Sequence, residues 1–105
     1  MELMLLFDMI ASFADAATED IFHGRNTRSA RNACPRSLWN VAVRKLDQLD
    51  SAESIDDLRI PPGNRLEKLS GNRAGEYSVR INEQYRICFR WTDGGPAGVV
   101  VTDYH

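Results

Sequence analysis

The chain has 105 residues and a formal net charge of −2, with 43% of its residues hydrophobic and 27% charged. This length predicts a single domain over residues 1–105, with one modest core. No apolar stretch approaches the roughly 20 residues that cross a bilayer, so we expect a cytoplasmic protein with no membrane partner. The negative net charge argues against general affinity for nucleic acids.

The N-terminal segment Met1–Phe7 is apolar, but it has no basic start and is too short for a secretory signal. If Met9 is the natural start, residues 1–8 are an extension of the domain. Residues 9–13 predict a short strand with Ile10 and Phe13 in the core.

A short helix is expected from about Thr18 to His23, because Asp15 or Thr18 can cap it and Gly24 can end it. The polar and basic residues 26–34 predict a loop or a frayed turn. Pro35 suits the first turn of a second helix, which runs to about Leu49. Its apolar stripe is Leu38, Trp39, Ala42, Val43, Leu46 and Leu49.

Residues 52–58 predict one more helical turn, and the Pro-Pro-Gly-Asn run at 61–64 breaks regular structure. After this break the period of the pattern becomes two. A short strand lies between Leu66 and Leu69, and residues 77–81 and 85–91 predict an antiparallel hairpin. A turn at 93–96 leads to a last strand at 98–103. One or two helices packed on an antiparallel meander form an α+β fold.

The two faces of the predicted hairpin differ. Tyr85, Ile87, Phe89 and Trp91 share one face, which the helices should bury. The opposite face carries Arg86, Cys88 and Arg90, beside Arg80 of the neighbouring strand. These arginines either form a functional surface or are simply solvent-exposed residues on the open face of the sheet.

The charges are unevenly distributed, and the cysteines match no metal site. Cys34 and Cys88 lie too far apart for a metal-ligand spacing, and two reduced thiols are expected. Residues 65–91 hold six basic and three acidic residues. Residues 21–46 contain no acidic residue and six basic ones, which suits a polyanionic partner: Arg25, Arg28, Arg31, Arg36, Arg44 and Lys45.

The chain closes on Asp103, Tyr104 and His105, three side chains that can exchange protons, directly after the apolar run at 99–101. A strand that holds them at the surface would create an acid–base group. The imidazole of His105 has an ordinary pKa of about 6.5, which suits either proton-transfer role near neutrality.

From about Met9 to His105 the chain resembles the HigB-type toxins (the GraT-like branch) of the RelE superfamily. The resemblance is densest in PPGNRLEKLSGNRAGEYSVRINEQYRICFRW (residues 61–91) and VTDYH (residues 101–105). It implies a RelE-like fold, a small twisted antiparallel sheet with two N-terminal helices on one face. It also implies ribosome-dependent cleavage of mRNA, without a metal or other cofactor, by attack of the RNA 2′-hydroxyl.

The resemblance assigns catalytic roles to Arg86, Asp103, Tyr104 and His105. Glu67 stands where the best-known member has a histidine, so either Glu67 takes over proton transfer or the role falls on His105 and Asp103. Arginine binds phosphate oxygens through paired donors, and tyrosine can stack on a base. The residues expected to contact RNA are Arg65, Lys68, Arg73, Arg80 and Gln84.

The expected partners are a HigA-like helix-turn-helix antitoxin, the ribosome and mRNA, with operator DNA reached only through the antitoxin. Two other functions stay open. One is a non-enzymatic toxin of the same fold that inhibits DNA gyrase, as ParE-type toxins do; the closing Asp-Tyr-His argues against it. The other is a weakened relative that mainly binds its antitoxin and operator.

Overall fold

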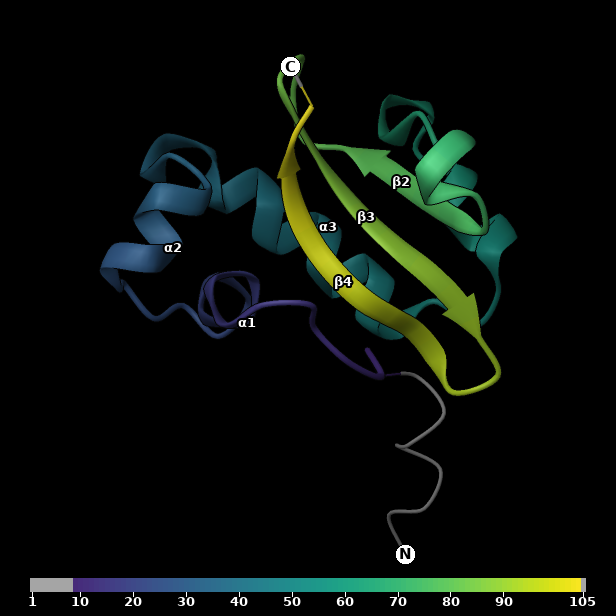
Figure 1. Cartoon of the computed structure of the whole chain (residues 1–105), viewed down its shortest axis with the longest axis horizontal. Coiled ribbons are helices and arrows are strands. Elements are labelled where there is room, and N and C mark those ends of the chain that lie inside the picture. The colour runs from purple at the N-terminus through teal and green to yellow at the C-terminus, as the bar shows by residue number, and fades with distance from the viewer. Residues whose placement is uncertain (1–8, 105) are drawn as a thin grey trace, which may run out of the picture.

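The computed structural model of the chain describes residues 9–104, so the predicted extension (residues 1–8) and His105 lie outside the described residues. Three α-helices precede four strands (Figure 1). The helices are α1 (Ala16–Phe22), α2 (Arg28–Ala33) and α3 (Trp39–Ser51), and the strands are β1 (Glu67–Lys68), β2 (Glu76–Arg80), β3 (Tyr85–Thr92) and β4 (Gly95–Asp103). Short 3-10 helices lie between them: η2 (Arg36–Leu38), η3 (Ile55–Arg59), η4 (Pro62–Asn64) and η5 (Gly71–Arg73).

The strands form one antiparallel sheet in the order β1-β2-β3-β4, which confirms the predicted α+β meander. In the hairpin, Ser78 pairs with Cys88 and Arg80 with Arg86, so the alternation placed these side chains on the correct face. All three α-helices contact β4. Figure 1 shows α3 behind the sheet and α1 and α2 beside β4, so the face that carries Arg86 stays outside the helical layer.

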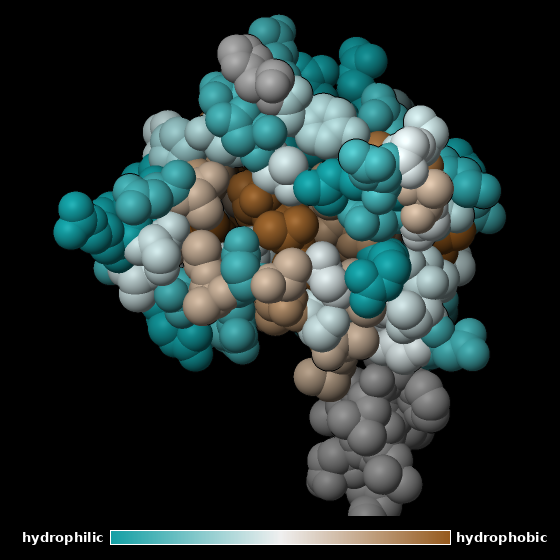
Figure 2. Space-filling model, viewed as in Figure 1, coloured by the Kyte–Doolittle hydropathy of each residue, from teal (hydrophilic) through white to brown (hydrophobic). Residues whose placement is uncertain are grey.

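The core lies between α3 and the inner face of the sheet. Leu46 and Leu49 of α3 are fully buried, as are Ile87 and Phe89 of β3. Burial of each such side chain contributes roughly 1.5–3 kcal/mol, so the predicted stripe of α3 helps to join the helical layer to the sheet. Figure 2 shows hydrophobic residues in the middle of one face of the molecule and hydrophilic residues along its upper rim.

Helix α1 begins two residues earlier than predicted because Asp15, rather than Thr18, caps it. The Oδ1 atom of Asp15 accepts a hydrogen bond from the Thr18 amide at 2.8 Å. The buried Thr18 hydroxyl accepts one from the Val101 amide at 3.0 Å and so ties α1 to β4. Gly24, whose φ of +73° favours glycine, follows the helix end as predicted.

The predicted loop at 26–34 is wrong, because residues 28–33 form α2. Thr27 caps this helix by accepting a hydrogen bond from the Ala30 amide at 3.2 Å, and its hydroxyl donates to Asp20 at 2.9 Å. Ala30 is the one fully buried residue of α2, so the sequence lacks the apolar repeat by which helices are recognised.

The predicted strand at 9–13 is also wrong, although the segment does lie against the sheet. A single parallel bridge joins Phe13 to Val99. The Ala11 amide donates to the Pro96 carbonyl at 2.7 Å, and the Val99 amide donates to the Ser12 carbonyl at 3.1 Å. As predicted, Ile10 and Phe13 pack against the core, but both are only partly buried.

The second helix was predicted as one piece from Pro35. It divides into η2 and α3, and α3 runs two residues past the predicted end at Leu49. The predicted helical turn at 52–58 is present as η3, and the Pro-Pro-Gly-Asn break contains η4.

Asn64, at the end of η4, is completely buried and fastens this loop to α3. Its side-chain amide nitrogen donates to Gln48 Oε1 at 2.9 Å and to the Leu58 carbonyl at 3.0 Å, and its oxygen accepts from Lys45. Burial, with the nearby charge of Arg44, lowers the pKa of Lys45.

Both cysteines are buried free thiols, and Cys88 lies on the outer face of the sheet, paired with Ser78. Among residues 9–104, no helix is long and apolar enough to cross a membrane.

Candidate functional site

Arg86 is the centre of the candidate site. It lies on β3 opposite Arg80, and only 7% of its surface is exposed. Its Nε donates to Ser78 Oγ at 2.7 Å, and its Nη2 donates to the Ser78 carbonyl at 3.3 Å and the Arg65 carbonyl at 2.5 Å. All three acceptors are neutral, so these hydrogen bonds fix the guanidinium without cancelling its charge.

The backbone of Arg65 supplies one of these acceptors because of its unusual conformation. Arg65 follows η4 and has a left-handed backbone, with φ of +45° and ψ of +56°. The preceding residue is Asn64, whose hydrogen bonds fix the end of the loop to α3. The position of Arg86 therefore depends on a contact between residues 21 positions apart in the chain.

A surface hollow of about 360 Å³ opens beside Arg86. Glu67 on β1 approaches Arg86, with 4.0 Å between Glu67 Oε1 and Arg86 Nη2, and the Glu67 side chain is 54% exposed. The ring of Tyr104 lies 5.8 Å from the guanidinium carbon of Arg86. The hollow is lined by Arg65, Glu67, Arg80, Asn82, Glu83, Arg86 and Tyr104.

The chain after β4 is held in place by the hairpin turn. The Tyr104 amide donates to the Gln84 carbonyl at 2.7 Å, and Gln84 Nε2 donates to Asp103 Oδ2 at 3.1 Å. Asp103 pairs with Tyr85 across the strands, and burial, followed by the charge of Asp103, raises the pKa of Tyr85. The Asp-Tyr pair is thus placed at the rim of the hollow, and His105 follows it outside the described residues.

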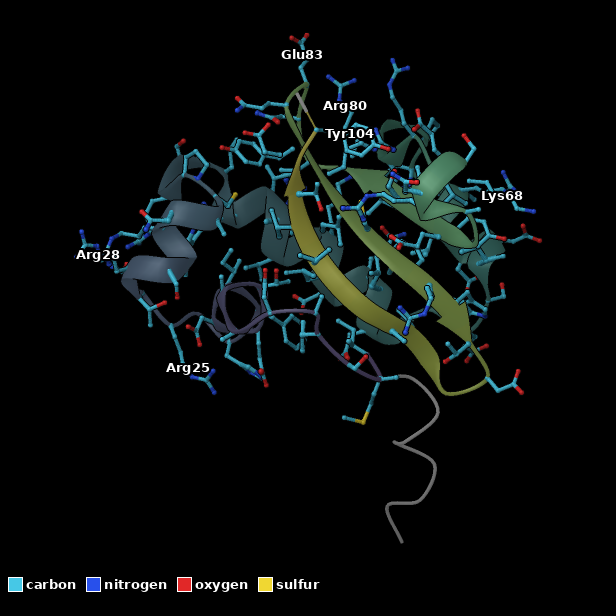
Figure 3. All side chains as sticks on the ribbon, in the orientation of Figure 1. Arg25, Arg28, Lys68, Arg80, Glu83 and Tyr104 are labelled. Atoms are coloured by element: carbon cyan, nitrogen blue, oxygen red, sulfur yellow. The ribbon has the colours of Figure 1, made fainter. Side chains whose placement is uncertain are left out.

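The structure brings only some of the predicted site residues together. Arg65, Glu67, Arg80, Arg86 and Tyr104 line one hollow, and Gln84 and Asp103 lie next to it. Arg80 and Tyr104 lie close to the same end of the sheet in Figure 3, whereas Lys68 points away at the far edge.

Three predicted RNA-contacting residues do not line the hollow: Gln84, which lies next to it, and Lys68 and Arg73, which lie farther away. Lys68 pairs with Tyr77, whereas Glu67 pairs with Ser78, so successive side chains of β1 point to opposite faces and Lys68 points away from Arg86. Arg73 forms an ion pair with Glu76, with 2.9 Å between its Nη1 and Glu76 Oε1.

Three residues of the site were missed by the sequence analysis. Ser78 anchors Arg86, and Asn82 and Glu83 line the hollow. Alternation does place Ser78 on the arginine face, which was the available signal. The Asn82 side chain accepts from the Gln84 and Tyr85 amides at 2.9 and 2.7 Å, and so shapes the turn.

The charges of the hollow favour an anionic ligand. Three arginines and two glutamates line it, and both glutamates stand on its exposed side. A guanidinium fixed in the wall of an open hollow is suited to bind phosphate oxygens. Among residues 9–104, no group of three histidine, cysteine or acidic residues could hold a metal ion.

Comparison with known proteins gives a family match over most of the chain. The model of the HigB-like toxin family, described as "RelE-like toxin of type II toxin-antitoxin system HigB", matches residues 11–105. Toxin HigB-1 of Vibrio cholerae is 55% identical over 60 residues, which are 57% of this chain and 63% of that protein. An uncharacterized protein of Haemophilus influenzae is 44% identical over 57 residues, which are 54% of this chain and 56% of its own length.

Each of these alignments covers less than two thirds of the relative's length. Among solved structures, the YoeB-YefM complex from Staphylococcus aureus contains a similar fold, with a TM-score of 0.55 and 23% sequence identity. That likeness covers 91% of this chain and 94% of the matched chain.

Proposed function

The chain belongs to the HigB-like family of RelE-like toxins from type II toxin–antitoxin systems, and on that premise we propose that it is a ribosome-dependent endoribonuclease that cleaves mRNA. The observation that carries the proposal is the state of Arg86. This guanidinium is buried and held by neutral oxygens, and it borders a hollow whose other charged side chains are exposed or, for Arg80, partly exposed.

The hollow suits the charge that develops in RNA cleavage. Attack of a 2′-oxygen on the adjacent phosphorus forms a new P–O bond, and the bond to the 5′-oxygen breaks. The phosphate oxygens carry extra negative charge in between, and preorganised donors stabilise that charge. Arg86 is positioned for this role, and Arg80, directly opposite on β2, adds a second guanidinium.

Two proton transfers are needed, one from the 2′-hydroxyl and one to the 5′-oxygen. Glu67 is a candidate base, because its carboxylate is exposed and 4.0 Å from Arg86. Asp103 and His105 are the alternative pair, and His105 is the residue able to act as the acid near neutral pH. Tyr104, which is 42% exposed, offers a ring for stacking or a hydroxyl for a hydrogen bond.

The remaining assignments follow from position. Arg65 and Arg80 would contact the backbone phosphates that flank the cleaved bond, and Gln84 would position Asp103. Lys68 and Arg73 would contact RNA only beyond the hollow. The mechanism as proposed uses these side chains without a metal or cofactor.

As a type II toxin, the protein has an antitoxin as its partner. We propose that this antitoxin is a HigA-like helix-turn-helix protein, that operator DNA is bound only through it, and that the toxin acts in the cytoplasm on mRNA held by the ribosome.

The test compares Arg86→Lys and Arg86→Ala with Arg90→Lys, a matched control on the same strand and face outside the hollow. Loss of a fixed donor to the transition state should lower the cleavage rate by about 100- to 1000-fold for Arg86→Lys, with little change for the control. Primer extension on mRNA in a purified translation reaction measures cleavage, and the same mRNA without ribosomes should stay intact.

Arg86→Ala leaves buried oxygens without a donor, so the folding of this variant is measured by circular dichroism. If Arg86→Ala does not fold, Arg86→Lys alone tests the role of Arg86 in cleavage. Full cleavage by a folded Arg86→Lys protein would exclude the assigned role. A DNA-damage response with intact mRNA would instead favour inhibition of gyrase.

A further inference from the structure

A second hollow, larger than the one beside Arg86, lies between α1 and α3. Its volume is about 620 Å³, and it shares no residue with the hollow on the sheet. Ile21, Trp39 and Val43 form an apolar floor, and Arg36, Asn40 and Arg44 stand around it as exposed side chains. We call this feature the helical groove.

The helical groove lies in the most basic part of the chain. Residues 21–46 contain no acidic residue. Within residues 9–104, the ion pair recorded for these basic residues is that of Arg25 with Asp20, at 3.1 Å. Arg36 instead stacks on the Trp39 ring, with 4.8 Å between its guanidinium carbon and the ring centroid. The charges of Arg36 and Arg44 are therefore available to carboxylates or phosphates of a ligand.

The floor of the groove favours a protein segment over RNA. RNA-binding surfaces offer aromatic faces on which bases stack. Trp39 is only 8% exposed, Arg36 covers its ring, and its Nε1 donates to the Cys34 carbonyl at 2.8 Å. The ring is thus committed to the protein interior. Ile21 is fully buried, so the part of the floor open to an aliphatic or aromatic side chain of a partner is Val43, which is only partly buried.

We propose that the helical groove binds an acidic segment of the antitoxin, with one apolar side chain on the floor and carboxylates paired with Arg36 and Arg44. The proposal rests on the antitoxin partner of the proposed function, and it names the surface and the chemistry of the contact. The groove is separate from the hollow beside Arg86, so occupation of the groove leaves that hollow open to solvent.

The test measures the affinity of the full toxin for the antitoxin encoded beside it, by biolayer interferometry at two salt concentrations. Arg44→Glu should weaken binding by about 10-fold or more, and Arg36→Glu/Arg44→Glu by about 100-fold or more, because like charges replace ion pairs in a partly desolvated site. The control is Arg59→Glu, an exposed arginine of η3 that pairs with Asp56 away from the groove.

Two further measurements decide between the possible outcomes. The unfolding midpoint of each variant is measured. If loss of the Arg36–Trp39 stacking destabilises the double variant, Arg44→Glu alone is used to test antitoxin binding. Binding of a labelled 12-nucleotide single-stranded RNA should be the same in wild type and variants. If RNA binding falls while antitoxin affinity is unchanged, the groove binds nucleic acid and the proposal is wrong.

The mRNA cleavage assay separates this proposal from the ribonuclease function. Arg36→Glu/Arg44→Glu should still cleave mRNA at the wild-type rate. Unchanged antitoxin affinity in that variant overturns the groove proposal and leaves the ribonuclease function standing. Absence of cleavage by the wild-type toxin, with weakened antitoxin binding in the variant, overturns the ribonuclease function and supports the groove.

Discussion

Arg86 is a buried cation that neutral groups hold in place, and we have proposed that it meets an anionic ligand. Its partners are one hydroxyl and two backbone carbonyls, and the carboxylate of Glu67 approaches only to 4.0 Å. A buried charge without full compensation costs stability, and a bound phosphate would supply the missing negative charge. Strand alternation predicted which face Arg86 occupies. Its burial could not be predicted, because it depends on the path of a loop 21 residues away.

Asn64 controls that loop, so its removal should affect both stability and catalysis. Asn64→Ala removes a hydrogen-bond partner from the Lys45 ammonium, the Gln48 side-chain oxygen and the Leu58 carbonyl, and we expect a loss of about 2–4 kcal/mol in the free energy of unfolding. The substitution should also displace the Arg65 carbonyl, which helps to hold Arg86, and so lower the rate constant of cleavage at saturating mRNA. Urea unfolding and single-turnover cleavage, at a temperature where the variant is folded, measure the two effects.

Gln48→Ala is the matched control for Asn64, because it removes one partner of the same cluster and leaves the asparagine in place. It should lower stability less and leave cleavage close to wild type. A folded Asn64→Ala protein with an unchanged rate constant would show that Asn64 contributes to stability alone.

Cys34 should make the protein less stable in alkaline solution. Burial raises the pKa of this thiol to about 11, from an ordinary value of 9.0. Above pH 9 the thiol ionises in the unfolded chain and stays protonated in the folded protein, so stability falls as pH rises toward 11. Between pH 8 and pH 11 the wild type should lose up to about 2 kcal/mol more than Cys34→Ala. Urea unfolding across this range measures the difference, and parallel curves for the two proteins would contradict it.

At the scale of elements, secondary structure was predicted correctly where apolar residues recur regularly and pack into the core. It was predicted wrongly where an element is fixed by one buried residue or by backbone hydrogen bonds. Helix α3 and strands β2 and β3 repeat apolar residues at the period of their structure, and each was predicted. Helix α2 buries one alanine, and the 9–13 segment bonds β4 through its backbone. Neither leaves a periodic signal in the sequence.

Thr27 is expected to hold α2 in place. It caps the helix and donates to Asp20, whose pKa is lowered by this bond and by that of Arg25. Thr27→Ala should lower the free energy of unfolding by about 1–2 kcal/mol, whereas Thr27→Ser keeps the hydroxyl and should change it little. Thermal unfolding followed by circular dichroism compares the two. Equal effects of both substitutions would mean that the methyl group, and not the cap, is responsible.

At the scale of the whole molecule, the helical layer and the sheet separate two surfaces. The sheet presents Arg86 and its hollow on the face that the helices leave uncovered, and the helices carry their own groove between α1 and α3. The sequence showed both as basic stretches, at 21–46 and 65–91. It did not show that the first encloses an apolar floor, because Ile21 and Trp39 meet only when α1 packs on α3.

The way the sheet ends on both sides bears on self-association. Extended backbone at a sheet edge invites strands of other molecules to add, which is a common start of aggregation. Here residues 11–14 form hydrogen bonds with backbone groups of β4 from Pro96 to Val99, and the Thr18 hydroxyl accepts a hydrogen bond from the Val101 amide. The opposite edge, β1, is two residues long and consists of an exposed glutamate and an exposed lysine. Among the described residues, neither edge offers a second copy a long row of open backbone groups, so the segment before α1 works against edge-to-edge association of the sheet.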